Sequence, residues 1–529
     1  MARPDRPQFL LAVSFALALG FDFLFWGKLW GLSFPVFIFF VLAAGFWLAR
    51  RQRLKLARKS LWLLGPIAFF ALVSIFRLEP FTLFLSRLLV FLLLAILVVS
   101  FVGGRWLEYG FSDFVVRLLG FVPSGLFLLK NTSAARISSR KKGFSLRVFA
   151  PAARGLLFAL PVLWFLGALL ASADPFFSRW LTSLFKFLSF KNASEYVFRG
   201  FYIFILTYIL AASYLYAFVK SKKENLRGSK PLFPLFLGFG EAATMLASVN
   251  ILFVAFVVIQ FRYFFGGLAN IVNNPAGLTF AEYARRGFAE LVIVAVTSFL
   301  FFIALSTVCK RERRQQKWFS GSGIALFFLV SVILVSSFQR LLLYERVFGF
   351  TRMRTFPHVF MIWLGLLLLA VAVLEVMQRQ RAFAVAILMA AIGFIATLPL
   401  LNVDAFIVRA NIQRAESGQD FDFAYLATLS EDALPALVSA YWQSLKGENG
   451  ALTESIAAAL VCSATLHSDY AAQLPWQSWT WSRTEAARQL NVLHSETTIP
   501  DLSLHLENGS YYVRVGGQEF PCVSPSIWD

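Results

Sequence analysis

The sequence has little charge and few residues of the kinds that build metal or nucleophilic sites. Of its 529 residues, 15% are charged, against about 25% in an average soluble domain. It has three cysteines and four histidines, and no Cys-x-x-Cys pair or Cys/His spacing of a metal site. We therefore expect no metal and no cofactor.

Motifs for phosphate binding and catalysis are also missing. The sequence contains no Walker A loop, no Gly-x-Ser-x-Gly, no His-Glu-x-x-His and no Gly-rich nucleotide loop. Glycosyltransferases that use lipid-linked sugars usually carry acids in a long first outer loop, and the loop around Lys28 is too short for that. The sequence favours a protein without enzymatic activity and leaves open a membrane enzyme that acts on a lipid-linked substrate.

Long apolar runs dominate residues 1–401, and the whole chain is 58% hydrophobic with 61 phenylalanines. A spanning helix needs about 20 mostly apolar residues. The first run resembles a signal peptide but continues through Trp26, which favours a first span. The sequence predicts an all-α polytopic membrane bundle of about eleven transmembrane helices in a lipid bilayer, with spans near 8–27, 29–49, 60–77, 81–102, 149–172, 199–219, 242–264, 287–308, 322–340, 357–377 and 382–401.

The net charge of +20 is unevenly distributed. Residues 1–401 carry 43 basic and 14 acidic residues, whereas residues 402–529 carry 6 and 15, a balance of −9. With eleven spans, every strongly basic loop falls on one side, which the positive-inside rule makes the cytoplasm. This pattern favours topogenic charge over nucleic-acid binding. We expect a multi-pass protein of the bacterial plasma (inner) membrane, with a cytoplasmic N-terminus and an extracytoplasmic C-terminal domain.

The segment 105–129 is ambiguous because its hydropathy would allow it to span. If it did, the basic loop at 130–147 would move outside. We therefore predict an interfacial amphipathic helix here, with Asp113 and Arg117 facing water.

Residues 402–529 have the composition of a soluble domain. Ser430 and the Ser482-x-x-Glu485 pattern predict helix starts, and Asn508-Gly509 between alternating segments predicts a β-hairpin. We expect a small, mostly helical domain that ends in this hairpin. Outside the cytoplasm, Cys462 and Cys522 could form a disulfide; the alternative is two buried free thiols.

Ionisable and amide side chains recur in the outer third of the predicted spans. They are Asp22, Arg87, Gln260, Arg262 and Glu290. Such residues are functional candidates because burying charge in a bilayer is costly. One interpretation is an outward-facing polar layer that holds a headgroup or solute, with Asp22 and Arg87 neutralising each other. The favoured interpretation is ordinary ion pairs between helices, or snorkelling to the interface.

The outer loop 344–354 carries Arg346, Arg352 and Arg354. These guanidinium groups could bind phosphate at the headgroup level. The favoured interpretation is that Arg346 pairs with Glu345 or with the C-terminal domain, because that domain is acidic and lies on the same predicted side.

Several segments together resemble a family of uncharacterised bacterial polytopic membrane proteins, known only as a domain of unknown function. They are ADPFF (173–177), QFRYFFGG (260–267), AEYARRGFAEL (281–291), YERVFGFTRMR (344–354), NVDAFIVRANIQR (402–414) and AYLATLSEDALPAL (424–437). The resemblance implies a bacterial plasma-membrane protein and supplies no activity or catalytic residue.

From these features we expect a non-enzymatic envelope protein that presents its C-terminal domain for interaction or signalling. An envelope protein is the expected partner of that domain. The alternative is a transporter or translocator of lipids or solutes that uses the outer polar layer.

Overall fold

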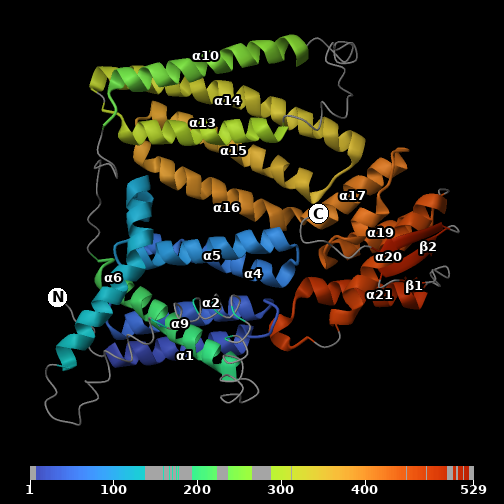
Figure 1. The fold of residues 1–529 in the computed structure, drawn as a ribbon, viewed down its shortest axis with the longest axis horizontal. Helices are drawn as coiled ribbons and strands as arrows, with labels where there is room; N and C mark the ends of the chain where they lie inside the picture. The colour runs from blue at the N-terminus through green and yellow to red at the C-terminus, as the bar shows by residue number, and fades with distance from the viewer. Residues whose placement is uncertain are drawn as a thin grey trace.

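The computed structural model describes residues 7–137, 193–222, 236–264, 288–310, 312–447, 450–471, 474–496, 504–507, 510–515 and 518–522, with five single positions between 159 and 177. Helices account for most of this part of the chain (Figure 1). The helices of the bundle lie roughly side by side, and the C-terminal elements gather at one end of it.

The first half of the bundle packs around large buried side chains, among them Phe34, Phe70 and Leu93. Helix α9 lies along both α1 and α6. The elements are α1 (Pro7–Phe25), α2 (Ser33–Arg51), α3 (Arg58–Leu61), α4 (Leu64–Phe76), α5 (Pro80–Ser100), η1 (Trp106–Glu108), α6 (Phe111–Ile137) and α9 (Ala193–Val219).

The second half has its own core around Phe302, Phe319 and Phe327. Helix α16 joins the two halves because it contacts both α15 and α5. The elements are α10 (Phe239–Phe264), α13 (Phe288–Val308), α14 (Arg313–Phe348), α15 (Arg352–Val376), η2 (Gln380–Ala382) and α16 (Phe383–Leu401).

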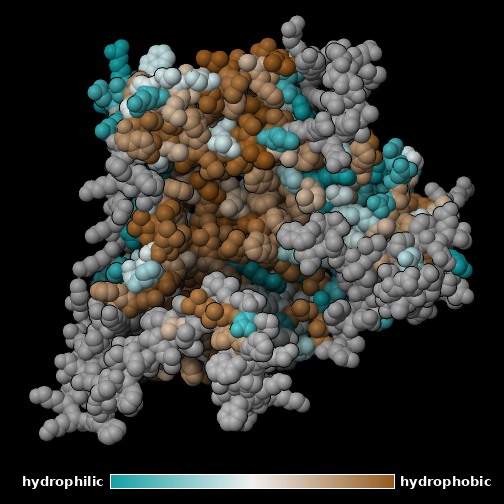
Figure 2. Space-filling model, in the orientation of Figure 1, coloured by the Kyte–Doolittle hydropathy of each residue, from teal (hydrophilic) through white to brown (hydrophobic). Residues whose placement is uncertain are grey.

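Among the described residues, eleven helices are long and apolar enough to cross a membrane. This confirms the polytopic helical bundle. Many of their large apolar side chains are exposed, and brown covers much of the bundle face in Figure 2. A surface of this kind requires lipid rather than water around it.

The set of eleven differs from the predicted set at one place. The predicted span 149–172 lies outside the described residues, apart from a few single positions. In its stead, Phe111–Leu128 within α6 meets the criteria of a span. In Figure 1, α6 is steeply inclined to the other bundle helices, at the end where the N-terminus is marked. The interfacial placement of this segment stays a prediction.

The prediction that Asp113 faces water is wrong. Its side chain is buried at 3% exposure, and its Oδ2 atom accepts a hydrogen bond from the Gly110 amide at 3.2 Å. The carboxylate caps the start of α6, a role that suits an acid at a helix N-terminus.

Helix α14 is longer than the predicted span 322–340. It begins in a polar segment, where Glu312 and Gln315 form a capping box. It ends at Gly349, whose φ of +80° favours glycine. Capping chemistry rather than hydropathy sets both ends.

Beyond α16 the chain turns at Asn402 and enters the C-terminal elements. These are α17 (Val403–Glu416), α18 (Phe423–Ala427), η3 (Glu431–Ala433), α19 (Leu434–Ser444), α20 (Gly450–Ala471), η4 (Trp476–Ser478), α21 (Trp481–Glu496), β1 (Leu504–Glu507), β2 (Ser510–Val515) and β3 (Gln518–Cys522). The strands pair antiparallel in the order β1-β2-β3. Strands β1 and β2 flank the predicted turn, and β3 is an addition that the sequence did not predict.

The helices predicted to begin at Ser430 and Ser482 are found, as η3 and α21, but the two hydroxyl groups bond elsewhere. Ser430 makes no capping bond and instead donates through Oγ to Asp404. Ser482 donates to the carbonyl of Phe76 in the bundle, at 2.6 Å. Both hydroxyl groups serve contacts between distant segments rather than local helix starts.

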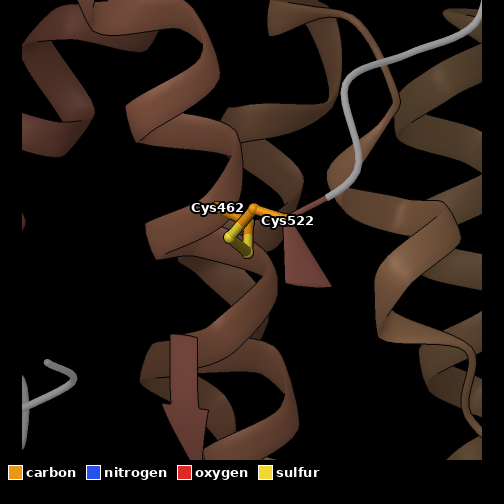
Figure 3. The surroundings of a disulfide bond; sticks show 2 residues. All are labelled: Cys462 and Cys522. Atoms are coloured by element: carbon orange, nitrogen blue, oxygen red, sulfur yellow. A yellow bond between two sulfur atoms is a disulfide. The ribbon is translucent and has the colours of Figure 1, made fainter. Parts of the chain in front are cut away.

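A disulfide joins α20 to β3. The bond links Cys462 and Cys522, whose Cα atoms lie 5.2 Å apart (Figure 3). Both residues are buried, next to Val513 of β2. The third cysteine, Cys309, is a buried free thiol at the end of α13.

Candidate functional site

The junction between the bundle and the C-terminal domain contains a buried ion pair. Arg352 begins α15, and its Nε and Nη2 atoms lie 2.8 and 2.5 Å from the two carboxylate oxygens of Asp404. Asp404 is fully buried in α17, and its Oδ2 atom also accepts from the amide and hydroxyl of Ser430. The Arg352 amide donates to the Tyr425 hydroxyl at 2.8 Å. A bidentate pair of this kind fixes geometry as well as charge.

Two further buried carboxylates complete the junction. The Oδ2 atom of Asp432 accepts from the amides of Leu78 and Glu79, at 2.7 and 3.0 Å, in the loop between α4 and α5. Glu79 caps α5 and lies 4.0 Å from Arg352 Nε. Burial raises the pKa of both the Glu79 and the Asp432 carboxyl groups, because desolvation disfavours the charged form. We call Glu79, Arg352, Asp404 and Asp432 the junction cluster.

A second set of contacts surrounds the junction cluster. Arg483 of α21 pairs with Glu431 at 3.1 Å. Arg77, at the end of α4, donates to the carbonyl of Pro399 in α16 at 2.8 Å. The apolar core beneath is continuous, because Val359 and Leu398 of the bundle cluster with the buried residues of the C-terminal domain. The domain and the bundle end therefore pack as one body.

In the loop that contains the predicted arginine triplet, Arg352 makes the contact with the acidic domain. Arg354 donates to the carbonyls of Phe348 and Gly349, at 2.9 and 2.5 Å, and so holds the loop itself. Arg346 is exposed and contributes only its carbonyl, which accepts from Arg414 at 3.2 Å.

Helix α17 also bonds to the backbone of the segment between α14 and α15. Asn411 both donates to and accepts from the backbone of Phe350, at 2.8 Å in each case. A Cβ atom added at Gly349 would lie 2.6 Å from Asn411 Oδ1 and Arg414 Nη1. Both atoms end movable side chains, so it is mainly the φ of +80° that favours glycine at this position.

The predicted pairing of Asp22 with Arg87 is not found. Asp22 accepts instead from Arg199, with Nε 2.9 Å from Oδ1, and from the Tyr202 hydroxyl, both on α9. Arg87 donates to the carbonyl of Trp30 at 2.7 Å and lies over the Trp30 ring. Among the described residues, no salt bridge includes Arg87.

The other predicted members of the polar layer are also separate. The Gln260 side chain accepts from Arg340 and Ser336 of α14, at 3.1 and 3.2 Å. Glu290 is exposed in the first turn of α13. Arg262 belongs to α10, and its side chain lies outside the described residues. Asp22, Arg87, Gln260 and Glu290 therefore bond to none of one another among the described side chains, and the outward-facing polar layer stays a prediction.

Two intramembrane acids were missed, although buried charge in a predicted span is itself a signal. Glu375 is fully buried near the end of α15 and accepts from Ser320 at 2.6 Å and from Gln380 at 3.1 Å. Glu345 of α14 is buried and lies 3.0 Å from His358 Nδ1 of α15. The predicted span 357–377 contains Glu375 and His358. Glu375 could therefore have been found from the sequence as an acid within a span, whereas Glu345 lies outside the predicted spans.

A shallow cavity of about 400 Å³ lies between α10 and α14, lined by Asn250, Lys317, Trp318, Gly321, Ser322 and Ala325. In the part of the chain that the structure describes, no three His, Cys, Asp or Glu residues gather in a way that could hold a metal ion.

Comparison with known proteins identifies a family. Residues 64–440 match the sequence profile of DUF4153, a domain of unknown function. The chain belongs to the DUF4153 family. The match begins in α4 and ends in α19, so it includes all four residues of the junction cluster. The DUF4153 region therefore crosses the predicted domain boundary at 401/402, and the recognition made from the motifs is confirmed. No curated protein and no solved structure matches the chain.

Proposed function

We propose that this DUF4153 protein is a bacterial plasma-membrane protein that presents residues 402–529 outside the cytoplasm as a fixed platform for another envelope component. The observation that carries the proposal is the junction cluster. Arg352 and Asp404 form a buried bidentate pair between α15 and α17, and Asp432 binds backbone amides of the α4–α5 loop.

Such a junction favours a platform over a tethered module. A domain on a flexible linker shares few contacts with its neighbour, whereas here a buried ion pair, two buried acids and a continuous core join the parts. Breaking a buried pair leaves an uncompensated charge, so separation of the parts is costly. The domain is therefore held in one orientation relative to the bundle.

Two observations support the extracytoplasmic side. Basic residues concentrate at the opposite end of the bundle, at the end of α2 and the start of α14 (Figure 1), for example Arg50, Arg51, Arg313 and Arg314. The Cys462–Cys522 disulfide suits an oxidising compartment. The balance of −9 in residues 402–529 favours a partner with a basic surface.

Site-specific photo-crosslinking in intact cells tests the platform. Crosslinkers replace Leu445 and Arg488, two exposed residues of the domain, and Arg50 serves as the matched position at the other end. We expect a defined protein adduct from the domain positions and none from Arg50. If neither domain position yields an adduct, while native mass spectrometry shows a bound solute or lipid, the platform proposal is wrong.

The second candidate is a transporter, and buried acids within spans favour it. Glu345 and Glu375 lie near opposite ends of the α14–α15 pair, and intramembrane acids commonly mark ion or proton paths. Glu375→Gln in reconstituted vesicles, with the exposed Glu312→Gln as control, tests this role. Proton-coupled uptake that is lost only in Glu375→Gln would favour transport.

A further inference from the structure

Three tryptophans lie close together and half-exposed in the C-terminal domain. Trp476, Trp479 and Trp481 are 52%, 40% and 52% exposed. A domain surrounded by water rarely exposes several large aromatic side chains in one short segment. A surface of this kind indicates a binding partner that the chain itself does not supply.

The segment is fixed to the end of the bundle. The Leu32 amide donates to the carbonyl of Trp479 at 2.9 Å, and the Leu29 amide donates to Ser478 Oγ at 3.0 Å. A Cβ atom added at Gly31 would lie 2.4 Å from the Trp479 carbonyl oxygen. The tryptophans therefore lie at the level where α1 ends and α2 begins.

That level is also the edge of the lipid-facing surface. The Trp476 ring lies 6.4 Å from the ring of Phe23, which is 59% exposed and belongs to the candidate span Gln8–Phe25. Lys28 Nζ lies 4.6 Å from the centre of the same Phe23 ring. An exposed phenylalanine within a span faces acyl chains, so its neighbours Trp476 and Lys28 fall at the boundary between chains and headgroups.

The indole N–H groups point to the same environment. Among the described residues, none of these three indole groups donates a hydrogen bond to the protein. Tryptophan is enriched at membrane interfaces because its ring is apolar while its N–H can bond to headgroup oxygens or water.

We infer that residues 476–481 anchor the C-terminal domain in the bilayer, with the indole rings in the headgroup region of the leaflet at that end of the bundle. The domain then contacts lipid as well as the ends of α1, α2 and α4. The inference depends on the position of the segment along the bundle and not on which side of the membrane that end faces.

Spin labels on the full-length protein in liposomes test the anchor. Cys309→Ser removes the free thiol, and single cysteines then replace Trp476 or Trp481. Arg488→Cys is the matched control because it lies on the same short helix, α21, with its side chain 64% exposed. We expect labels at 476 and 481 to collide more often with oxygen than with a water-soluble nickel complex, and the label at 488 to do the reverse.

A second measurement keeps the test informative if a cysteine variant fails to fold. Brominated phosphatidylcholine quenches tryptophan near the acyl chains. We expect the quenched part of the emission to decrease in the triple Trp→Phe variant at 476, 479 and 481, and to stay unchanged in Trp442→Phe, whose ring packs against the domain core. Water-like accessibility at 476 and 481, or unchanged quenching in the triple variant, would overturn the inference.

Discussion

The two ends of the DUF4153 bundle use charge differently. At the end that carries the C-terminal domain, Asp404 and Asp432 are buried, and they and the half-buried Arg352 are bonded to segments far away in the sequence. At the opposite end, basic residues such as Arg50 and Arg314 are exposed. Charge at the first end holds tertiary structure together, whereas exposed basic charge at the second end is the kind from which the positive-inside rule predicts orientation.

The largest expected effect comes from breaking the buried pair of the junction cluster. Arg352→Leu leaves the Asp404 carboxylate buried without its cation, which should cost about 3–5 kcal/mol. We expect a strong decrease in folded yield and in the midpoint of thermal unfolding in detergent, measured by fluorescence-detected size exclusion.

The controls distinguish a buried pair from an ordinary surface pair. The exposed pair of Arg488 with Glu485 should tolerate Arg488→Leu with little change. The double variant Arg352→Leu/Asp404→Leu should be more stable than Arg352→Leu alone, because no unpaired charge remains. Equal losses in the single and double variants would mean that the pair does not hold the junction.

The next effect concerns the covalent link within the C-terminal domain. The Cys462–Cys522 bond closes a loop of 60 residues, and its removal should cost about 2–4 kcal/mol. We expect Cys462→Ser to expose the strands to limited proteolysis while the bundle stays intact. Cys309→Ser is the control. Three thiols instead of one in the denatured, unreduced wild-type protein, found by alkylation and intact mass, would show that the bond does not form.

A smaller effect depends on pH. Burial raises the pKa of Asp432, so the native state binds this proton more tightly than the unfolded chain does. The resulting stabilisation is fully present below about pH 3.9 and is lost as pH rises through the raised pKa. We therefore compare the free energy of unfolding of Asp432→Asn with that of wild type at two pH values. The variant should gain stability relative to wild type between pH 5 and pH 7.5, by at most about 1.4 kcal/mol for each pH unit.

Glu485 provides a control of opposite sign. Arg488 and Gln489 lower the pKa of the Glu485 carboxyl group to about 2. The stabilisation that the Glu485 carboxylate contributes is present above about pH 4.3 and decreases as pH falls through the lowered pKa. Glu485→Gln should therefore show no difference between pH 7.5 and pH 5. The same pH trend in both variants would exclude burial of Asp432 as the cause.

The sequence predicted features that depend on local pattern. Apolar runs of sufficient length predicted the polytopic bundle, because burial in lipid requires that pattern. Motifs such as YERVFGFTRMR (344–354) predicted the family. Both predictions rest on residues that are near one another in the chain. The ion pair with the C-terminal domain is made by Arg352, whereas the sequence favoured Arg346 for it.

The sequence could not predict which distant charges meet. Asp404 and Asp432 stand at helix starts, where acids are often exposed, yet both are buried at the junction with the bundle. Asp22 was expected to pair with Arg87, but α9 lies beside α1 and brings Arg199 to it. Helix neighbours are determined by packing between elements far apart in sequence, and hydropathy carries no information about that choice.

The smallest effect is expected at the ion pair of Asp22 with Arg199, which the structure shows in place of the predicted pair of Asp22 with Arg87. Asp22 and Arg199 lie partly exposed near the ends of α1 and α9, and Tyr202 donates to the same carboxylate. We expect Asp22→Asn and Arg199→Gln each to lower the thermal midpoint slightly, and the double variant to lose less than the sum, because both changes remove one interaction. The cycle of Asp22→Asn with Arg87→Leu should instead be additive, since Arg87 bonds to Trp30. Coupling in the second cycle and additivity in the first would restore the pairing that the sequence suggested, and would mean that α9 does not pack against α1 in the membrane.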